Sequence, residues 1–274
     1  MAPLVEKTQS RLEEIAAGVH GVFGLVVEDL AGDYRFAVNE DRQFAQASAI
    51  KIPILMTVLR EAHEGKLDLA EMRWIDKKTG GTGILAELGS RTTQMSVEDL
   101  AVLMIVLSDN TATNMLIDEV GLKPVTDLMF SLGAEDTRLQ RRMMDTVAAA
   151  RGEENLSTPA DAARIMRLLQ EGKFVDRKVS DHALAILRKA KPGAVKSAVP
   201  PDVPVAFKPG AIPGVATEWA IVELPDQPYI VIVMGAYGED AALKQAMKNV
   251  SAAAYDFFHR VAHSSKYGAV IEKK

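Results

Sequence analysis

Cysteine is absent from the 274 residues, so disulfide bonds, thiolate metal sites and a cysteine nucleophile are excluded. Basic charge is not in excess either. The net charge is −5, and the lysines and arginines are scattered, which disfavours nucleic acid or an anionic membrane as a partner. No stretch reaches the roughly 18 apolar residues of a membrane span. What remains is an ordinary globular composition, 48% hydrophobic and 25% charged, in a chain long enough for one large domain or two domains that share a core.

The chain also has no internal repeat, no low-complexity linker and no visible targeting segment. Its first residues, MAPLVEKTQSRLEEIAAGVHG, lack the basic start and unbroken apolar stretch of a secretory signal. Leu4, Leu12, Ile15 and Val19 instead recur at helical spacing, which predicts a folded helix. This start fits a cytoplasmic protein, or an exported one whose signal lies outside this sequence.

Strand patterns lie on both sides of a helical middle. The segment VFGLVVEDLAGDYRFAV, residues 22–38, reads as two strands joined by a turn at Gly32-Asp33. Three further strands are predicted at 205–208, 217–223 and 229–234, and a long amphipathic helix at 240–263. Between the two groups, capping residues and helix-stopping glycines support helices at 49–62, 97–107, 112–120, 124–132, 159–170 and 181–189.

This order predicts an α+β fold. Five antiparallel strands, split two and three around the helical block, form a sheet flanked by N- and C-terminal helices. We expect a discontinuous α/β domain of residues 1–45 plus 191–274, and an inserted all-α domain of residues 46–190. A cleft between two such domains is a natural site for a small substrate.

The first candidate for chemistry is Ser48-Ala49-Ile50-Lys51. A Ser-x-x-Lys arises by chance about 0.7 times in a chain of this composition, so it is also consistent with an ordinary helix start. Its geometry nevertheless permits catalysis, because residues three apart lie on one helical face. Pro53 fits only near a helix start, which places Ser48 where free N–H groups favour an anion. Lys51 among isoleucines would lose basicity and could act as a base.

Ser108-Asp109-Asn110 is the second candidate, with a chance expectation of only about 0.014. The tripeptide stands between two predicted helices, where Asp109 or Asn110 is expected to cap the helix that follows. A cap needs one polar residue, whereas this junction supplies three in a row. The other two side chains are therefore expected to face a cleft.

Lys-Pro-Gly occurs twice and is interpreted differently each time. Lys191-Pro192-Gly193 ends a helix, where such residues are routine, so we assign it to structure. Lys208-Pro209-Gly210 closes the predicted strand 205–208. Proline has no N–H to donate, so this strand should lie at the sheet edge, or at least be unpaired at Pro209. An edge that faces the helical domain would place Lys208 in the cleft.

These three motifs, in this order and on these elements, resemble those of the class A β-lactamases and penicillin-binding proteins. The likeness extends over nearly the whole chain and includes SDNTATNMLID, the TRL at 137–139, STPADAARIM and the closing helix. It implies that Ser48 attacks a lactam carbonyl, that neutral Lys51 takes the proton, and that Ser108 relays a proton to the leaving nitrogen. Asn110 and Lys208 would hold substrate, and the backbone N–H groups of Ser48 and Ala211, which follows Gly210, would bind the oxyanion. The resemblance requires no metal or organic cofactor.

The chain departs from the family pattern at the residues that free the acyl-enzyme. Met143 stands where the lactamases have the water-activating glutamate, and Val147 stands near the place of an asparagine that helps hold that water. Asp145 is the carboxylate we name as a possible substitute, against the alternative that it is a solvent-facing loop acid. The usual closing ion pair would here join Arg141 to Asn155, which predicts no salt bridge.

Carboxylate recognition also departs from the pattern. Pro209 replaces a hydroxyl residue, and Thr217 stands near the place of an arginine. Each missing charge-assisted bond is worth roughly 1.5–3 kcal/mol.

Three functions stay open on these residues: a serine acyl-hydrolase of β-lactams, a penicillin-recognising sensor or trap that acylates and stalls, and a D,D-peptidase or esterase. The expected partner is a β-lactam or peptidoglycan-like acyl donor, and the expected state is a monomer. The resemblance implies an extracytoplasmic location.

His259 and His263 have the spacing of a zinc pair but lack a third ligand, so we interpret them as residues of a helix C-terminus.

Overall fold

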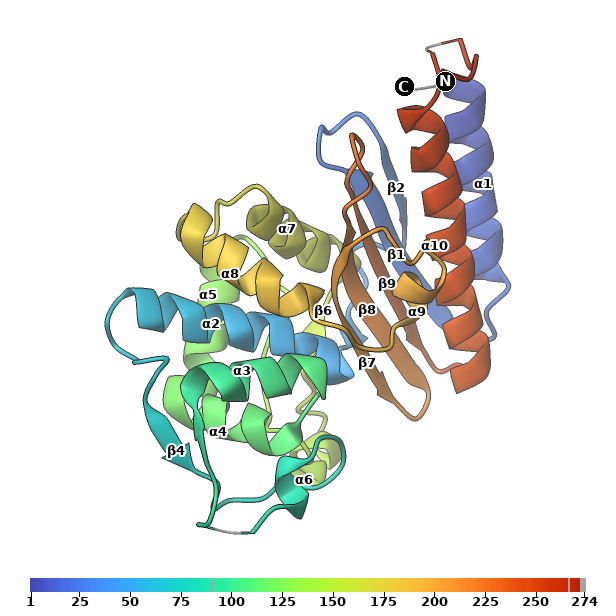
Figure 1. The fold of residues 1–274 in the computed structure, drawn as a ribbon. Coiled ribbons are helices and arrows are strands. Elements are labelled where there is room, and N and C mark those ends of the chain that lie inside the picture. Colours follow the sequence, from blue (N-terminus) through green and yellow to red (C-terminus); the bar gives the residue numbers. More distant parts are fainter. Residues whose placement is uncertain (90, 266, 272–274) are drawn as a thin grey trace.

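A five-stranded antiparallel sheet, in the order β2-β1-β9-β8-β7, lies at the centre of the computed structural model, which describes residues 1–89, 91–265 and 267–271 (Figure 1). The strands are β1 (Val22–Asp29), β2 (Arg35–Val38), β7 (Val205–Ile212), β8 (Val215–Val222) and β9 (Tyr229–Ala236). The predicted α+β class, with strands contributed by two distant parts of the chain, is confirmed.

The sheet is covered on both faces, which explains the continuous apolar strands of the sequence. Alternate side chains of a strand point to opposite faces, so neighbouring residues enter different cores. Val26 and Trp219 belong to the core shared with the helical block. Val27 and Phe207 belong to the core under the terminal helices.

Helices α1 (Ala2–Ala17) and α10 (Asp240–Ala262) run side by side along the outer face of the sheet (Figure 1). Leu12 and Phe257 are buried in the core beneath them. The two helices predicted at the ends of the sequence are confirmed in this position.

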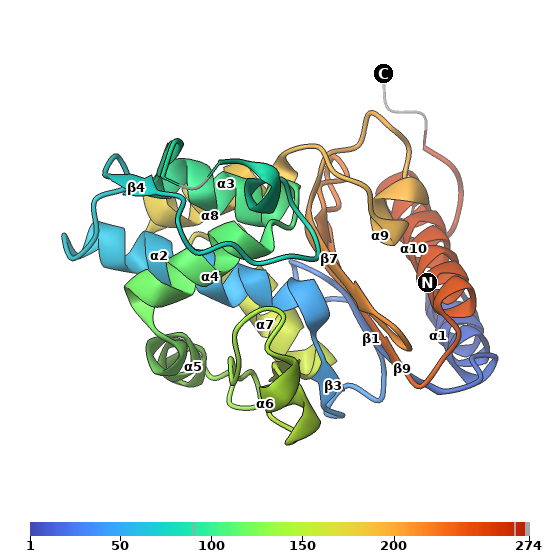
Figure 2. The same cartoon turned by 90° about the horizontal axis from the view of Figure 1, so that it is seen from below.

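The helical block covers the other face of the sheet (Figure 2). It comprises α2 (Lys51–His63), α3 (Val97–Val106), α4 (Asn110–Val120), α5 (Leu122–Ser131), α6 (Thr146–Ala150), α7 (Pro159–Gln170) and α8 (Arg177–Arg188). It also contains the 3₁₀ turn η2 (Leu85–Glu87) and two small sheets, β3 (Phe44–Ala45) with β6 (Leu156–Ser157) and β4 (Met72–Trp74) with β5 (Gln94–Ser96). The block is therefore mostly rather than wholly helical, and its exact boundaries remain a prediction.

Two elements near the cleft differ from the sequence prediction. The helix expected from residue 49 begins as a 3₁₀ turn, η1 (Ala47–Ile50), before α2. Strand β7 is an edge strand as predicted, but it does not end at Lys208. It continues through Pro209 to Ile212, because an edge strand needs hydrogen bonds on one side only.

The connection from α8 back to the sheet contains one more short helix, α9 (Ala194–Ser197). Within the described residues, none of the helices has the length and apolar character needed to cross a membrane.

Candidate active site

Ser48 lies where the chain passes from β3 into α2. Ala47, the residue before it, has φ +45°, in the left-handed region that residues with a side chain seldom adopt. Ala47 is the first residue of η1, and Ser48, the next residue, is half-buried and lies three residues before Lys51. Such backbone strain is found preferentially at functional sites.

Lys51 is fully buried in the apolar start of α2, yet its ammonium group has polar neighbours. Nζ donates to Ser108 O at 2.7 Å and to Asn110 Oδ1 at 2.9 Å, and lies 3.1 Å from Ser108 Oγ. Burial, and then the positive charge of Lys208, lower the pKa of Lys51 well below its ordinary value, while Asp109 opposes the shift. The neutral amine, which can accept a proton, is therefore favoured.

Asp109 anchors the turn between α3 and α4. Its carboxylate caps α4 by accepting from Ala112 N at 2.9 Å, and its second oxygen accepts from Ile84 N at 2.6 Å and Leu85 N at 2.8 Å. The capping role expected for Asp109 or Asn110 thus belongs to Asp109. Asn110 is free to bind the Lys51 ammonium group, and its amide also donates to Gly80 O at 3.1 Å.

Ser108 is held between two lysines in a strained conformation. Its φ is +53°, and its Oγ lies 3.1 Å from Lys51 Nζ and 3.1 Å from Lys208 Nζ. The Thr82 hydroxyl donates to Ser108 O at 2.6 Å, so the loop Gly80-Gly81-Thr82-Gly83 supports Ser108. Thr82 was not singled out from the sequence.

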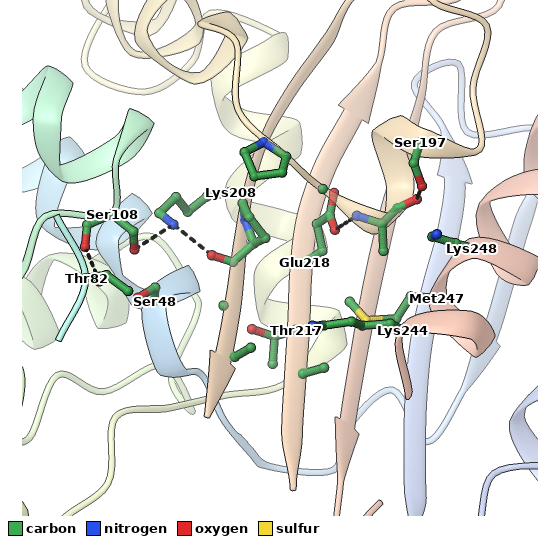
Figure 3. Close-up of a pocket in the computed structure, with 17 residues that line it drawn as sticks. Ser48, Thr82, Ser108, Ser197, Lys208, Thr217, Glu218, Lys244, Met247 and Lys248 are labelled. Atoms are coloured by element: carbon green, nitrogen blue, oxygen red, sulfur yellow. Dashed lines mark hydrogen bonds between the residues drawn. The ribbon is translucent and has the colours of Figure 1, made fainter. Parts of the chain in front are cut away.

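Lys208 reaches the same point from β7. It is 2% exposed, and its Nζ donates to Ser108 Oγ and, at 2.8 Å, to Pro209 O (Figure 3). Burial, followed by the charge of Lys191, lowers the pKa of Lys208 to about 7, against the opposing influence of Glu218. The charge of Lys208 therefore changes near neutral pH.

Gly210 brings β7 against the backbone of η1. A Cβ on Gly210 would lie 2.7 Å from the backbone nitrogens of Ser48 and Ala49, so only glycine permits this approach. Ala211 follows directly and lines the same cavities as Ser48. These cavities, of about 460 and 280 Å³, meet at the serine. The structure thus brings together every residue singled out in the three motifs.

Glu218 and Lys191 are two further charged residues that influence Lys208, and the sequence did not predict this role. Glu218, on β8, is 1% exposed and accepts from Ala194 N at 2.7 Å and Val195 N at 3.2 Å. Burial raises the pKa of Glu218 to about 7 despite these bonds. Lys191 donates to Leu187 O at the end of α8, which fits its structural assignment, but its charge also reaches Lys208. An acid within an apolar strand was the only signal in the sequence.

The loop between α5 and α7 presents Met143 where the resemblance suggested a glutamate. The side-chain amide of Asn114 fixes this residue, because its Oδ1 accepts from Met143 N at 2.9 Å and its Nδ2 donates to Met143 O at 3.1 Å. Met143 is 8% exposed and lines the 280 Å³ cavity with Ser48. An apolar thioether, which cannot activate water, therefore lines the same cavity as Ser48.

Two carboxylates of this loop have structural partners. Asp145 caps α6 by accepting from Ala148 N at 2.9 Å, and it is not among the residues that line either cavity. Glu154 does line the smaller cavity, where it forms an ion pair with Arg141 at 2.9 Å. The prediction that Arg141 has no salt bridge is therefore wrong: the acid lies one position before Asn155, which instead binds the loop backbone at Gln140 N and Arg141 N.

Thr217, which stands near the place of the family's arginine, has a structural role. Thr217 is buried and donates through its hydroxyl to Gln46 O at 3.0 Å, so it brings no charge to the cleft.

Within the described residues, no cluster of three or more His, Asp or Glu side chains is placed to hold a metal ion. The rings of His259 and His263 contact each other at the end of α10, with centroids 4.2 Å apart and planes tilted by 34°.

Comparison with known proteins gives a consistent family. Residues 7–258 match the model of the beta-lactamase enzyme family. An imipenem-hydrolyzing beta-lactamase of Enterobacter cloacae is 26% identical over 220 residues, which are 77% of this chain and 75% of that protein.

Solved structures agree with this assignment. A beta-lactamase of Sphaerobacter thermophilus superposes with a TM-score of 0.83 at 30% identity, covering 91% of this chain and 95% of its own. A single-residue mutant of PBP-A, in an acyl-enzyme complex with penicillin-G, superposes with a TM-score of 0.84 at 25% identity, covering 94% of this chain and 97% of its own.

Proposed function

The chain belongs to the beta-lactamase enzyme family, and from this premise we propose that it opens β-lactam rings through an acyl-enzyme on Ser48 and releases the product slowly. The observation that carries the proposal is that Lys51 Nζ and Lys208 Nζ each lie 3.1 Å from Ser108 Oγ, at the cavity that Ser48 also lines. The same family membership leads us to propose an extracytoplasmic location.

The acylation step follows from this arrangement. Ser48 Oγ attacks the lactam carbonyl carbon while neutral Lys51 accepts the hydroxyl proton. The ring C–N bond then breaks, and Ser108 donates its proton to the departing nitrogen while it recovers one from a neighbouring lysine. The N–H groups of Ser48 and Ala211 stabilise the oxyanion, and Lys208 attracts the substrate carboxylate.

Slow release is favoured by the surroundings of Met143. Freeing the acyl group requires a base that activates water, and such a base contributes typically 10²–10⁴-fold. Asp145 is occupied as a helix cap and Glu154 as the partner of Arg141. The likeness to PBP-A, a protein whose mutant is seen as a penicillin-G acyl-enzyme, points in the same direction.

A chromogenic cephalosporin followed by absorbance and by intact mass tests the proposal. We expect a burst of about one equivalent of colour, a mass increase that persists after excess substrate is removed, and a much slower steady rate. Ser48→Ala should show neither burst nor adduct while keeping the circular dichroism of the native protein.

Other outcomes separate the alternatives. Sustained rapid colour without an adduct would show efficient turnover and contradict slow release. No reaction with the cephalosporin, together with Ser48-dependent cleavage of a p-nitrophenyl ester, would replace the proposal by an esterase.

A further inference from the structure

The larger cavity continues well beyond the groups that act in acylation. From Ser48 and Ser108 it passes Lys208, crosses the exposed edge of β7 and extends between α9 and α10 (Figure 3). Pro192 and Ser197 line this extension above the sheet, and Met247 lines it from α10. A volume of about 460 Å³ exceeds what a bicyclic lactam core needs, so the far part is open to a substituent of the substrate.

Two lysines stand at the far end of this cavity. Lys244 and Lys248 are four residues apart on α10, so they lie on one face of the helix, and both are exposed. Neither ammonium group has a hydrogen-bond or ion-pair partner within the part of the chain that the structure describes. Figure 3 shows both of them at the opposite end of the cavity from Ser48 and Ser108.

The remaining charges along the wall do not cancel these lysines. Glu218 is the acidic residue among the lining residues, and both its carboxylate oxygens accept from backbone N–H groups of α9. Lys208 is buried and already engaged with Ser108 and Pro209. The cavity therefore carries an excess of positive charge, and the two exposed ammonium groups make up the part that has no partner.

We propose that Lys244 and Lys248 form a second anion subsite, which binds a carboxylate on the leaving-group side of the acyl donor, beyond the carboxylate held at Lys208. The preferred substrates are then acyl donors with two acidic groups. This inference rests on the proposed function only for the orientation of the substrate, because the lysines and the cavity are independent of the chemistry at Ser48.

Equilibrium binding to the Ser48→Ala protein tests the subsite without acylation. The probes are two cephalosporins that differ only in a C3 substituent ending in a carboxylate or in the corresponding carboxamide. We expect the acid to bind about threefold to tenfold more tightly at low ionic strength, as for two partly exposed ion pairs, and this preference to shrink in 0.5 M salt. Adding Lys244→Ala and Lys248→Ala should bring the ratio of the two affinities close to one.

Lys123→Ala is a control for the loss of a surface ammonium group, because it removes one positive charge from α5, away from the cavity. It should preserve the preference for the acid. Equal binding of the two probes, no binding of either, or a preference that survives loss of both α10 lysines would overturn the subsite. Acylation of the wild-type protein by the same probes is read separately by mass, so failure of the proposed function and failure of the subsite are distinguishable.

Discussion

At the scale of single residues, the site depends on lysines that burial has weakened as bases. Lys51 and Lys208 are both buried, and each lies 3.1 Å from the same hydroxyl of Ser108. The positive charge of Lys208 adds to burial in lowering the pKa of Lys51, which favours a neutral Lys51 beside a charged Lys208. This state supplies a base and an anion-binding cation together.

This arrangement predicts a pH dependence for acylation by an anionic lactam. The rate should fall toward low pH as Lys51 gains a proton and ceases to be a base. It should also fall as pH rises through about 7, because Lys208 then loses the charge that attracts the substrate carboxylate. Measuring kcat/KM for acylation by stopped-flow absorbance gives this profile, and an uncharged ester substrate should lack the fall above pH 7.

Glu218 offers a sharper test of the same electrostatics. Its negative charge raises the pKa of Lys208, so Glu218→Gln should move the fall in rate to lower pH. Glu223→Gln, which removes the acid paired with Arg188 on the surface, is the control and should leave the profile in place. If the pH profile of Glu218→Gln does not move, the fall in rate at high pH is not caused by Lys208.

At the scale of elements, we propose that the segment from α5 to α7 sets the rate of release. Met143 is held by Asn114 against the cavity that borders Ser48. Met143→Glu places a carboxylate beside the acyl group and should shorten the lifetime of the adduct by roughly 100-fold or more. The lifetime is measured by intact mass after removal of excess lactam.

Met143→Gln is the control for this prediction, because glutamine has nearly the same shape but cannot accept a proton at neutral pH. An adduct equally persistent in both variants would show that another step limits release.

The same loop shows how far sequence reasoning extends. The absence of the usual glutamate was visible, but the salt bridge of Arg141 was missed because its partner moved by one residue, from position 155 to Glu154. A loop has no periodicity that fixes which side chain points inward, so its contacts cannot be read from spacing. The three motifs were easier to predict because each lies on or directly beside a regular element, namely α2, α4 or β7, whose pattern fixes where it begins.

At the scale of the whole molecule, the site exists only where the sheet and the helical block meet. Ser48 comes from η1, Lys51 from the start of α2, Ser108 from the turn before α4, and Lys208 from the edge strand β7. The edge position of β7 was predicted from Pro209 and is confirmed, whereas the order of the strands was not predicted. The roles of Glu218 and α9 were not, because they depend on packing between segments that the sequence does not relate.

Gly210→Ala tests this convergence. A methyl group 2.7 Å from the nitrogens of Ser48 and Ala49 must push β7 away from η1, and a displacement of about 1 Å typically costs on the order of 100-fold in rate. We expect a comparable loss in the acylation rate, measured by burst kinetics. Gly80→Ala, whose added methyl meets no atom within 4 Å, should react nearly as fast as the native chain.

The central claim is that Ser48 is the residue that becomes acylated, and one peptide decides it. Trypsin releases residues 43–51, QFAQASAIK, in which Ser48 is the sole hydroxyl. After incubation with benzylpenicillin, mass spectrometry should find this peptide heavier by one intact penicilloyl group, and the Ser48→Ala protein should carry no adduct. An unmodified peptide 43–51 in a protein that reacts with penicillin at another residue would contradict the account.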